Sequence, residues 1–424
     1  MKYASKAALY LLTLAVLALF LPKLYDQIVF QRIEKTHLFY SPVSKRFIYT
    51  ERAAAFDPAA AAKAEDHHSD IIYRDQEGEY YDRLEFERQL PFIYYRNMDL
   101  RGYLPMEIDG IILDRDTIKD ERQVLELAGR NISGHGPVED LWPLFEADPG
   151  QAGLVFPDDR CRFTETGLEF VNADYNRVDE ELTARFSSAL SEAGFAFPAR
   201  HWAGTFTILK PFDNGVFLVD ANGSLYHLKR LRNEPLLRPV ALPEGLIPRH
   251  FTMSESERFH GLLLDTENRL HLVLRQDYGI VSIPIELYNP EDMDFKLLFD
   301  PLYRTAVYSD DVTIRALVMD TDYRPLKSFA YPMASGLRTW KHQLRDLLLP
   351  FSLTLHSPYS RFLEFNLAPG SHLPGLAMLP GLLMLGVFAW ARGLRPNRPR
   401  FWAFAALFSL TGIYGLIAAW FIEE

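Results

Sequence analysis

The feature that most constrains the fold is a basic connector between two apolar stretches near the C-terminus. Residues 373–391 and 401–422 are almost entirely apolar. The nine residues between them include four arginines, namely Arg392, Arg395, Arg398 and Arg400. Short loops rich in Lys and Arg stay on the cytoplasmic side of a membrane. The pattern predicts a membrane hairpin with a cytoplasmic connector, and it places the acidic end at Glu423 outside.

A third apolar stretch, residues 7–21, follows Lys2 and Lys6 and obeys the same charge rule. Residues 21–26 contain no small-x-small cleavage site, which favours a retained anchor over a cleaved signal peptide. The N-terminus is then cytoplasmic, and residues 26–371 are extracytoplasmic. The predicted parts are an anchor (1–25), a juxtamembrane strand and linker (26–69), a mixed α/β region (70–200), a β-rich propeller-like region (201–370) and a membrane hairpin (371–424).

Composition excludes several classes of protein. Apolar residues make up 48% of the chain and aromatic residues 13%, which excludes general disorder. The net charge of −11 argues against a nucleic-acid partner, because phosphate binding needs a basic face. The single cysteine, Cys161, permits no intramolecular disulfide. Arg160 and Arg162 beside it would favour a reactive thiolate, whereas an incidental half-buried thiol is the simpler interpretation.

The extracytoplasmic part is predicted to be mainly β, with a few helices. Short apolar runs separated by turn residues recur along residues 70–81 and 201–366. Helical patterns occupy residues 82–89, 117–127, 178–193 and 337–349. The last of these is amphipathic, with Arg338, Lys341 and Arg345 on one face, so it either packs on the β domain or lies on the membrane surface.

A weak internal repeat supports this fold class. Three apolar runs each end on an aspartate that opens a turn, at Asp220, Asp265 and Asp320. In such a turn the aspartate accepts hydrogen bonds from the backbone, so each unit reads as a β-hairpin. Asp75 and Asp114 are candidate divergent members. The three aspartates are 45 and 55 residues apart. Hairpins that recur at this spacing indicate either propeller blades or stacked β-sheets.

The sequence shows no phosphate-binding glycine loop, no Gly-x-Ser-x-Gly elbow and no His-Glu-x-x-His motif. We therefore assign no catalytic, cofactor-binding or metal-binding residue. His135 lies in a Ser-Gly-His-Gly loop and is of interest as a ligand contact. His227 and His271 follow equivalent strand positions, so they either converge on a metal or haem, or are separate structural histidines. The pair at His67 and His68 reads as part of a solvated linker.

Residues 194–199, 210–220 and 225–229 resemble the core of an uncharacterised family of bacterial membrane-anchored proteins. The resemblance covers residues 70–422. It implies an N-terminal anchor, a β-rich middle and C-terminal transmembrane helices in the bacterial inner membrane. It also implies association with ABC-type transporters, so an ABC-type permease is the expected integral-membrane partner besides the lipid bilayer. The resemblance identifies no site residue.

We therefore expect a mainly β extracytoplasmic domain with three transmembrane helices. The expected function is a non-enzymatic accessory or binding subunit of an inner-membrane complex, and the complex is expected to be a transporter. The alternative is a membrane-bound periplasmic hydrolase, with its acidic residues brought together by the fold.

Overall fold

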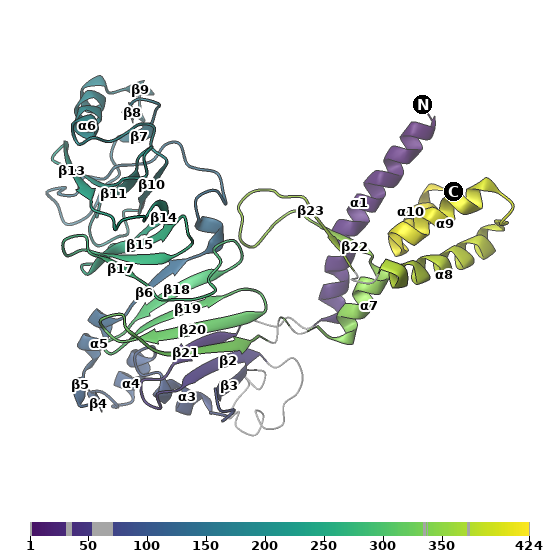
Figure 1. Cartoon of the computed structure of the whole chain (residues 1–424), viewed down its shortest axis with the longest axis horizontal. Coiled ribbons are helices and arrows are strands. Elements are labelled where there is room, and N and C mark those ends of the chain that lie inside the picture. Colours follow the sequence, from purple (N-terminus) through teal and green to yellow (C-terminus); the bar gives the residue numbers. More distant parts are fainter. Residues whose placement is uncertain are drawn as a thin grey trace.

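The structure is a computed structural model that describes residues 2–30, 36–52, 71–333, 336, 338–370 and 374–423. Its main body is a stack of antiparallel β-sheets, and a group of helices lies to one side of this stack (Figure 1). The linker interpretation of His67 and His68 concerns a segment outside the described residues.

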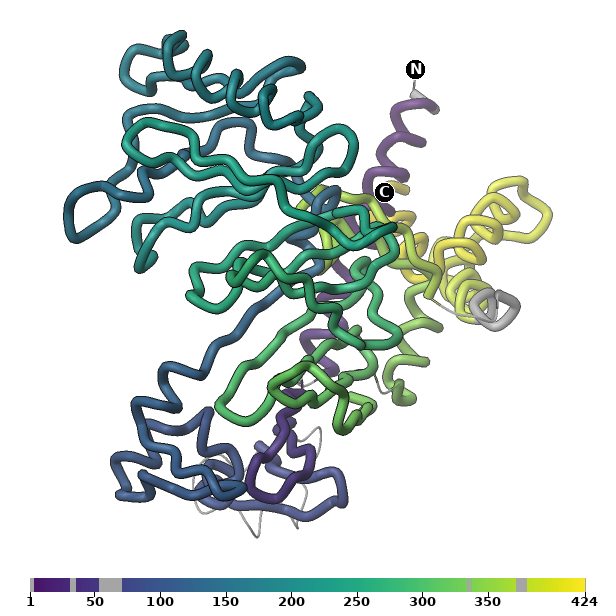
Figure 2. Tube along the Cα trace, turned by 60° about the vertical axis from the view of Figure 1, so that its left-hand side comes forward, coloured from purple at the N-terminus to yellow at the C-terminus, as the bar shows by residue number. Residues whose placement is uncertain are grey.

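The sheets stack face to face, and Figures 1 and 2 place the first and last of them at opposite ends of the stack. From the bottom of Figure 1 upwards, the first sheet contains β1 (His37–Tyr40), β2 (Phe47–Arg52) and β3 (Ile71–Asp75), and the second contains β18 (Asp294–Phe299), β19 (Arg304–Ser309), β20 (Thr313–Met319) and β21 (Pro325–Pro332) with β6 (Gln123–Leu127). The third sheet contains β14 (Pro248–Met253), β15 (Phe259–Asp265), β16 (Leu270–Leu274) and β17 (Ile280–Ser282), and the fourth contains β10 (His201–Gly204), β11 (Val216–Val219), β12 (Leu225–Leu231) and β13 (Glu234–Val240). The uppermost sheet contains β7 (Asp159–Phe163), β8 (Leu168–Asn172) and β9 (Arg177–Val178).

Neighbouring sheets are joined by apolar layers. Phe47 packs with Val318 between the two lowest sheets, and Leu272 packs with Leu297 one layer higher. All residues of β11, β15 and β19 are buried, because these strands have a neighbouring sheet or helix on both faces. The mainly β fold is thus confirmed. Its described sheets form an open stack rather than a closed ring.

The chain crosses to the far end of the stack and builds three of the sheets on its way back. Strand β6 pairs antiparallel with β18, with Leu125 opposite Leu297, although the two strands are far apart in sequence. From β6 the chain runs to β7 at the far end, and then builds β10–β13, β14–β17 and β18–β21 on the way back. This route brings the segment after β6 next to β10 and β14.

The predicted turn aspartates share one geometry. The Oδ1 atoms of Asp220, Asp265 and Asp320 each accept hydrogen bonds from the backbone N–H groups two and four residues later, at 2.7–2.9 Å. Asp75 does the same at 2.9 Å. Asp114 instead caps a helix by accepting from the N–H of Thr117, so it does not belong to the repeat.

Short helices and ribbons decorate the stack. They are α3 (Arg83–Gln89), α4 (Tyr95–Leu100), β4 (Met106–Ile108), β5 (Ile111–Leu113), α5 (Arg115–Glu121), the 3₁₀ helix η1 (Gly129–Asn131) and α6 (Glu180–Glu192). Asp82 forms a capping box with Glu85 at the start of α3. In α6 the apolar stripe containing Phe186 and Leu190 is buried against the uppermost sheets, as its periodicity predicts.

The helical side contains α1 (Lys2–Val29), α7 (Trp340–Leu348), α8 (Pro374–Arg392), α9 (Pro399–Thr411) and α10 (Ile413–Ile422). Among the described residues, only the segment Ala4–Val29 is both long and apolar enough to cross a membrane. The expectation of three such helices was therefore wrong. The predicted third span is broken at Gly412, whose φ of 54° favours glycine. Hydropathy alone could not reveal this break, because both sides of it are apolar.

The break changes the position of the C-terminus. Helix α10 turns back along α1, and Glu423 forms an ion pair with Lys6 at 2.7 Å. Tyr10 donates a further hydrogen bond to the same carboxylate. The acidic end therefore lies beside the start of α1, whereas the hairpin prediction placed it at the opposite end.

Helix α7 packs against α1 instead of the β domain. The Tyr25 hydroxyl donates to the Lys341 carbonyl at 3.0 Å, and Arg345 pairs with Asp26 at 3.1 Å. His342 stacks on Phe30. After α7 the chain forms a ribbon of two strands, β22 (Phe351–Thr354) and β23 (Asn366–Pro369), which runs from α1 towards the stack (Figure 1).

The turn aspartates should differ in their contribution to stability. Asp265 is fully buried and also accepts bonds from Arg269 and His271, whereas the side chain of Asp320 is 31% exposed. We expect Asp265→Ala to lower the free energy of unfolding by about 2 to 4 kcal/mol and Asp320→Ala by about 1 kcal/mol. Urea unfolding of the full chain in detergent, followed by tryptophan fluorescence, measures both. Equal losses would show that burial of the turn carboxylate does not matter.

Candidate functional site

A cleft of about 390 Å³ lies where three sheets present their edges. Strands β6, β10 and β14 are each the edge strand of their sheet, and all three line the cleft together with the segment 130–139. Trp202 and Phe206 form an aromatic wall that is backed by the buried Trp142. Arg130 and Arg361 also line the cleft. Convergent polar groups beside an aromatic wall are typical of binding sites.

Ser133 lies between two histidines from different sheets. Its Oγ is 3.0 Å from Nδ1 of His201 and 3.0 Å from Nδ1 of His250. His201 belongs to β10 and His250 to β14, and their ring centroids are 4.9 Å apart. The sequence separations of 68 and 117 residues explain why no local motif revealed this group.

Backbone donors fix the tautomers of both imidazoles. The N–H of Phe251 donates to Nε2 of His201, so the proton of this ring is on Nδ1 and is donated to Ser133 Oγ. The backbone N–H of Ser133 donates to Nδ1 of His250, so this ring carries its proton on Nε2 and donates it to Thr252. The Ser133 hydroxyl therefore donates to His250, the one imidazole of the pair that can accept its proton.

His250 is nevertheless a poor general base. Burial lowers its pKa to about 3, with the neighbouring His201 and Arg249 adding to the effect. Burial also lowers the pKa of His201 to about 4. Among the described residues no carboxylate forms an ion pair with either imidazole. A serine nucleophile needs a base whose protonated form is stabilised, and this one is not. The two histidines instead hold two sheet edges and the segment at Ser133 together.

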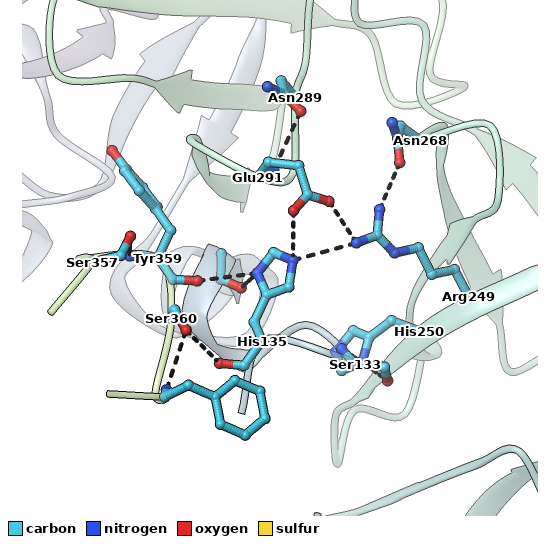
Figure 3. A network of polar contacts seen from close by, with 12 residues as sticks. Ser133, His135, Arg249, His250, Asn268, Asn289, Glu291, Ser357, Tyr359 and Ser360 are labelled. Carbon is cyan, nitrogen blue, oxygen red and sulfur yellow. Dashed lines mark hydrogen bonds and ion pairs between the residues drawn. The ribbon is translucent and has the colours of Figure 1, made fainter. Parts of the chain in front are cut away.

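His135 joins the same segment to the ribbon of β22 and β23 (Figure 3). Its Nδ1 lies 2.7 Å from the Gly129 carbonyl and 3.1 Å from that of Tyr359, and its own carbonyl accepts from the N–H of Arg361 at 2.6 Å. On its other side, Nε2 contacts Glu291 at 2.9 Å. Both ring nitrogens of His135 thus contact protein groups, which gives this residue a structural role.

The other candidate residues of the sequence do not form a centre. His227 contacts Tyr278 and the Asn214 carbonyl, whereas His271 contacts Asp265 and Ser282. No group of three His, Cys, Asp or Glu side chains in the described ranges could hold a metal ion. The metal or haem hypothesis for the two histidines thus gains nothing from the geometry.

Cys161 of β7 is fully buried in the apolar core that also contains residues of β8 and α6. Burial raises the pKa of its thiol well above the usual value, and this effect outweighs the lowering by Arg230 and Arg160. The side chain is therefore an inert thiol.

The histidine pair makes stability depend on pH. Both folded-state pKa values lie below the ordinary 6.5, so the unfolded chain binds more protons at mildly acidic pH. Their contribution is present above pH 6.5 and is lost as the pH falls towards 4. We expect His201→Gln, which keeps an acceptor for the Phe251 N–H, to remove up to about 3 kcal/mol of this pH-dependent loss. Urea unfolding between pH 7 and 4 measures the slope, and exposed His356→Gln is the control. An unchanged slope for His201→Gln would contradict this interpretation.

Comparisons with solved structures give weak likenesses. PorZ, a surface component of the type-IX secretion system of Porphyromonas gingivalis, has 12% identity and a TM-score of 0.22, with 70% of this chain and 27% of PorZ covered. The dihydro-heme d1 dehydrogenase NirN has 8% identity and a TM-score of 0.22, with 59% and 65% covered. A prolyl endopeptidase has 9% identity and a TM-score of 0.19, with 76% and 44% covered.

The chain thus spans less than two thirds of the length of each of these structures. No curated protein matches it. A family described as a domain of unknown function, DUF4857, matches residues 37–319, which include the lining of the cleft except Arg361 and most of the stacked sheets. The chain belongs to the DUF4857 family.

Proposed function

We propose that this protein is a membrane-anchored, non-enzymatic binding subunit of a bacterial inner-membrane complex. Its stacked sheets, within residues 26–371, face the periplasm or the outside, and its N-terminus is cytoplasmic. The cleft between β6, β10 and β14 holds the ligand. The partner is an integral-membrane protein, and the family resemblance noted from the sequence points to an ABC-type permease.

The observation that carries the proposal is the surface of α1. Its apolar segment Ala4–Val29 is only 11% buried in its most apolar window, although α10, α7 and β22 pack on it. Large apolar side chains such as Leu11 and Leu12 are more than 60% exposed. An apolar helix of this length that is not covered by its own protein requires another apolar environment, and a bilayer provides one.

The arrangement of the charged ends supports the orientation. Lys6 lies beside Glu423, and Arg392 of the basic connector donates to the carbonyl of Trp420 in the same helix α10. The two basic segments therefore lie at the same end of the helical group. The charge rule requires both of them to be cytoplasmic, and this packing allows it.

The chemistry of the cleft supports binding rather than catalysis. The aromatic wall at Trp202 and Phe206 offers ring faces to a ligand, and Arg130 and Arg361 offer hydrogen-bond donors. Ser133 has no strong base beside it. A site at the edges of the sheets that is held together by two histidines suits the binding of a ligand.

A hydrolase is the competing function, since Ser133 does contact an imidazole. We expect no labelling of Ser133 by a fluorophosphonate probe at pH 7.5, because the accepting His250 has its pKa lowered to about 3. Mass spectrometry of the treated full chain checks this, with Ser133→Ala as the matched control. A probe adduct on Ser133 would support the hydrolase instead.

The anchor can be tested by introducing charges. We expect the full chain to stay in the membrane pellet after an alkaline carbonate wash. Replacing Leu12 and Val16 by Asp should release it, because each Asp near the centre of a span costs about 3 kcal/mol. Leu209→Asp is the matched control, since Leu209 is 91% exposed and lies on the β stack. Release of the parent chain by the wash would overturn the proposed anchoring.

A further inference from the structure

The connector between α8 and α9 carries positive charge that the described part of the protein does not neutralise. It lies on the side of the helical group away from the β stack (Figure 1). Arg395, Arg398 and Arg400 are exposed, and none of them forms an ion pair with a carboxylate of the described residues. The next acidic residue towards the C-terminus, Glu423, is already paired with Lys6. The charge of the connector is therefore available to an anionic partner.

A turn fixes the shape of the connector. The N–H of Arg398 donates to the Arg395 carbonyl at 3.0 Å, and Pro396 occupies the second position of this turn. A β-turn of this kind places the Cα atoms of its first and fourth residues within about 7 Å of each other. Arg392 holds the start of the connector on α10, since it donates to the Trp420 carbonyl at 3.2 Å. The two guanidinium groups of the turn thus start from neighbouring backbone positions, close enough to bind one phosphate group.

The helices on both sides of the connector expose apolar side chains. On α8, Leu383, Val387 and Trp390 are exposed, and their spacing of four and three residues places them on one face. Trp390 is 87% exposed and precedes the arginines directly, and Trp402 of α9 is 65% exposed and follows Arg400 by two residues. Tryptophans at the boundary between an apolar surface and basic residues are typical of the interface between lipid headgroups and acyl chains.

This combination selects an amphipathic anion. A soluble anion would leave the tryptophans and the apolar face of α8 in water, and a zwitterionic lipid brings its own cation to the phosphate. A phospholipid with a net negative headgroup satisfies both parts, because its acyl chains cover the apolar side chains and its phosphate accepts hydrogen bonds from the guanidinium groups. Clusters of four or more arginines immediately cytoplasmic of an apolar helix are typical of such lipid sites.

We propose that the connector between α8 and α9 binds the headgroup of an anionic phospholipid of the cytoplasmic leaflet. Arg395 and Arg398 contact the phosphate, and Trp390 and Trp402 lie at the level where the acyl chains begin. This inference rests on the proposed membrane-anchored function and names the lipid class that the helical group recognises.

Titration of the purified full chain in a non-ionic detergent tests the inference. The probe is dioctanoyl phosphatidylglycerol, and native mass spectrometry measures the fraction of chain that carries it. We expect replacement of both Arg395 and Arg398 by Gln to weaken binding about 25-fold, because each arginine beside an anionic headgroup contributes about fivefold. Replacement of both by Lys should keep the affinity within about threefold, since the charge remains. The matched control replaces Arg232 and Arg324 by Gln, two exposed arginines of the β stack, and should leave binding unchanged.

Two further probes separate the sources of the phosphate. We expect dioctanoyl phosphatidylcholine to bind at least tenfold more weakly than the phosphatidylglycerol, and glycerol 3-phosphate, which has no acyl chains, to show no saturable binding at the same concentrations. Equal binding of either probe would overturn the inference, and so would an unchanged affinity of the Gln variant or an equal loss in the Lys variant.

The carbonate wash of the parent chain reports on the anchoring separately. If the chain is retained in the membrane but shows no preference for phosphatidylglycerol, only the lipid site is wrong. If the chain is washed off, the proposed anchoring itself is wrong.

Discussion

The structure depends above all on burying apolar side chains between stacked sheets. Each inner sheet has apolar residues on both faces, so it is stable only with a neighbour above and below it, as at Phe217, which stacks on Phe251 of the next sheet at 4.3 Å. The chain meets this requirement by building the sheets in an out-and-back order and by adding β6 to the edge of β18. Removing one layer would expose two apolar faces at once.

The cleft is a consequence of this arrangement. Stacking sheets face to face brings their edge strands side by side, and unpaired backbone groups then line the space between the edges. His201 satisfies one such group, the N–H of Phe251, and His250 satisfies the N–H of Ser133. The two imidazoles therefore serve the architecture, while Trp202 lines the cleft without taking part in these bonds.

The ribbon of β22 and β23 connects this architecture to the helices. Through His135 it touches the segment that lines the cleft, and through Phe351 it touches α10. The same segment of about 20 residues, 351–370, thus lies against both parts of the molecule. The ribbon thus links the segment that lines the cleft to the C-terminal helices.

The sequence by itself determined what depends on near neighbours. The apolar N-terminal helix, the mainly β class, the helix predicted over residues 178–193 and the turn at Asp265 all follow from contacts within a few residues, so composition and spacing were enough. The tertiary structure alone decided the rest. The pairing of β6 with β18, the meeting of Ser133 with His250 and the reversal of the chain at Gly412 depend on groups brought together from distant segments or on one backbone angle. Periodicity cannot encode these, because the free energy that selects them comes from burial between whole sheets and helices.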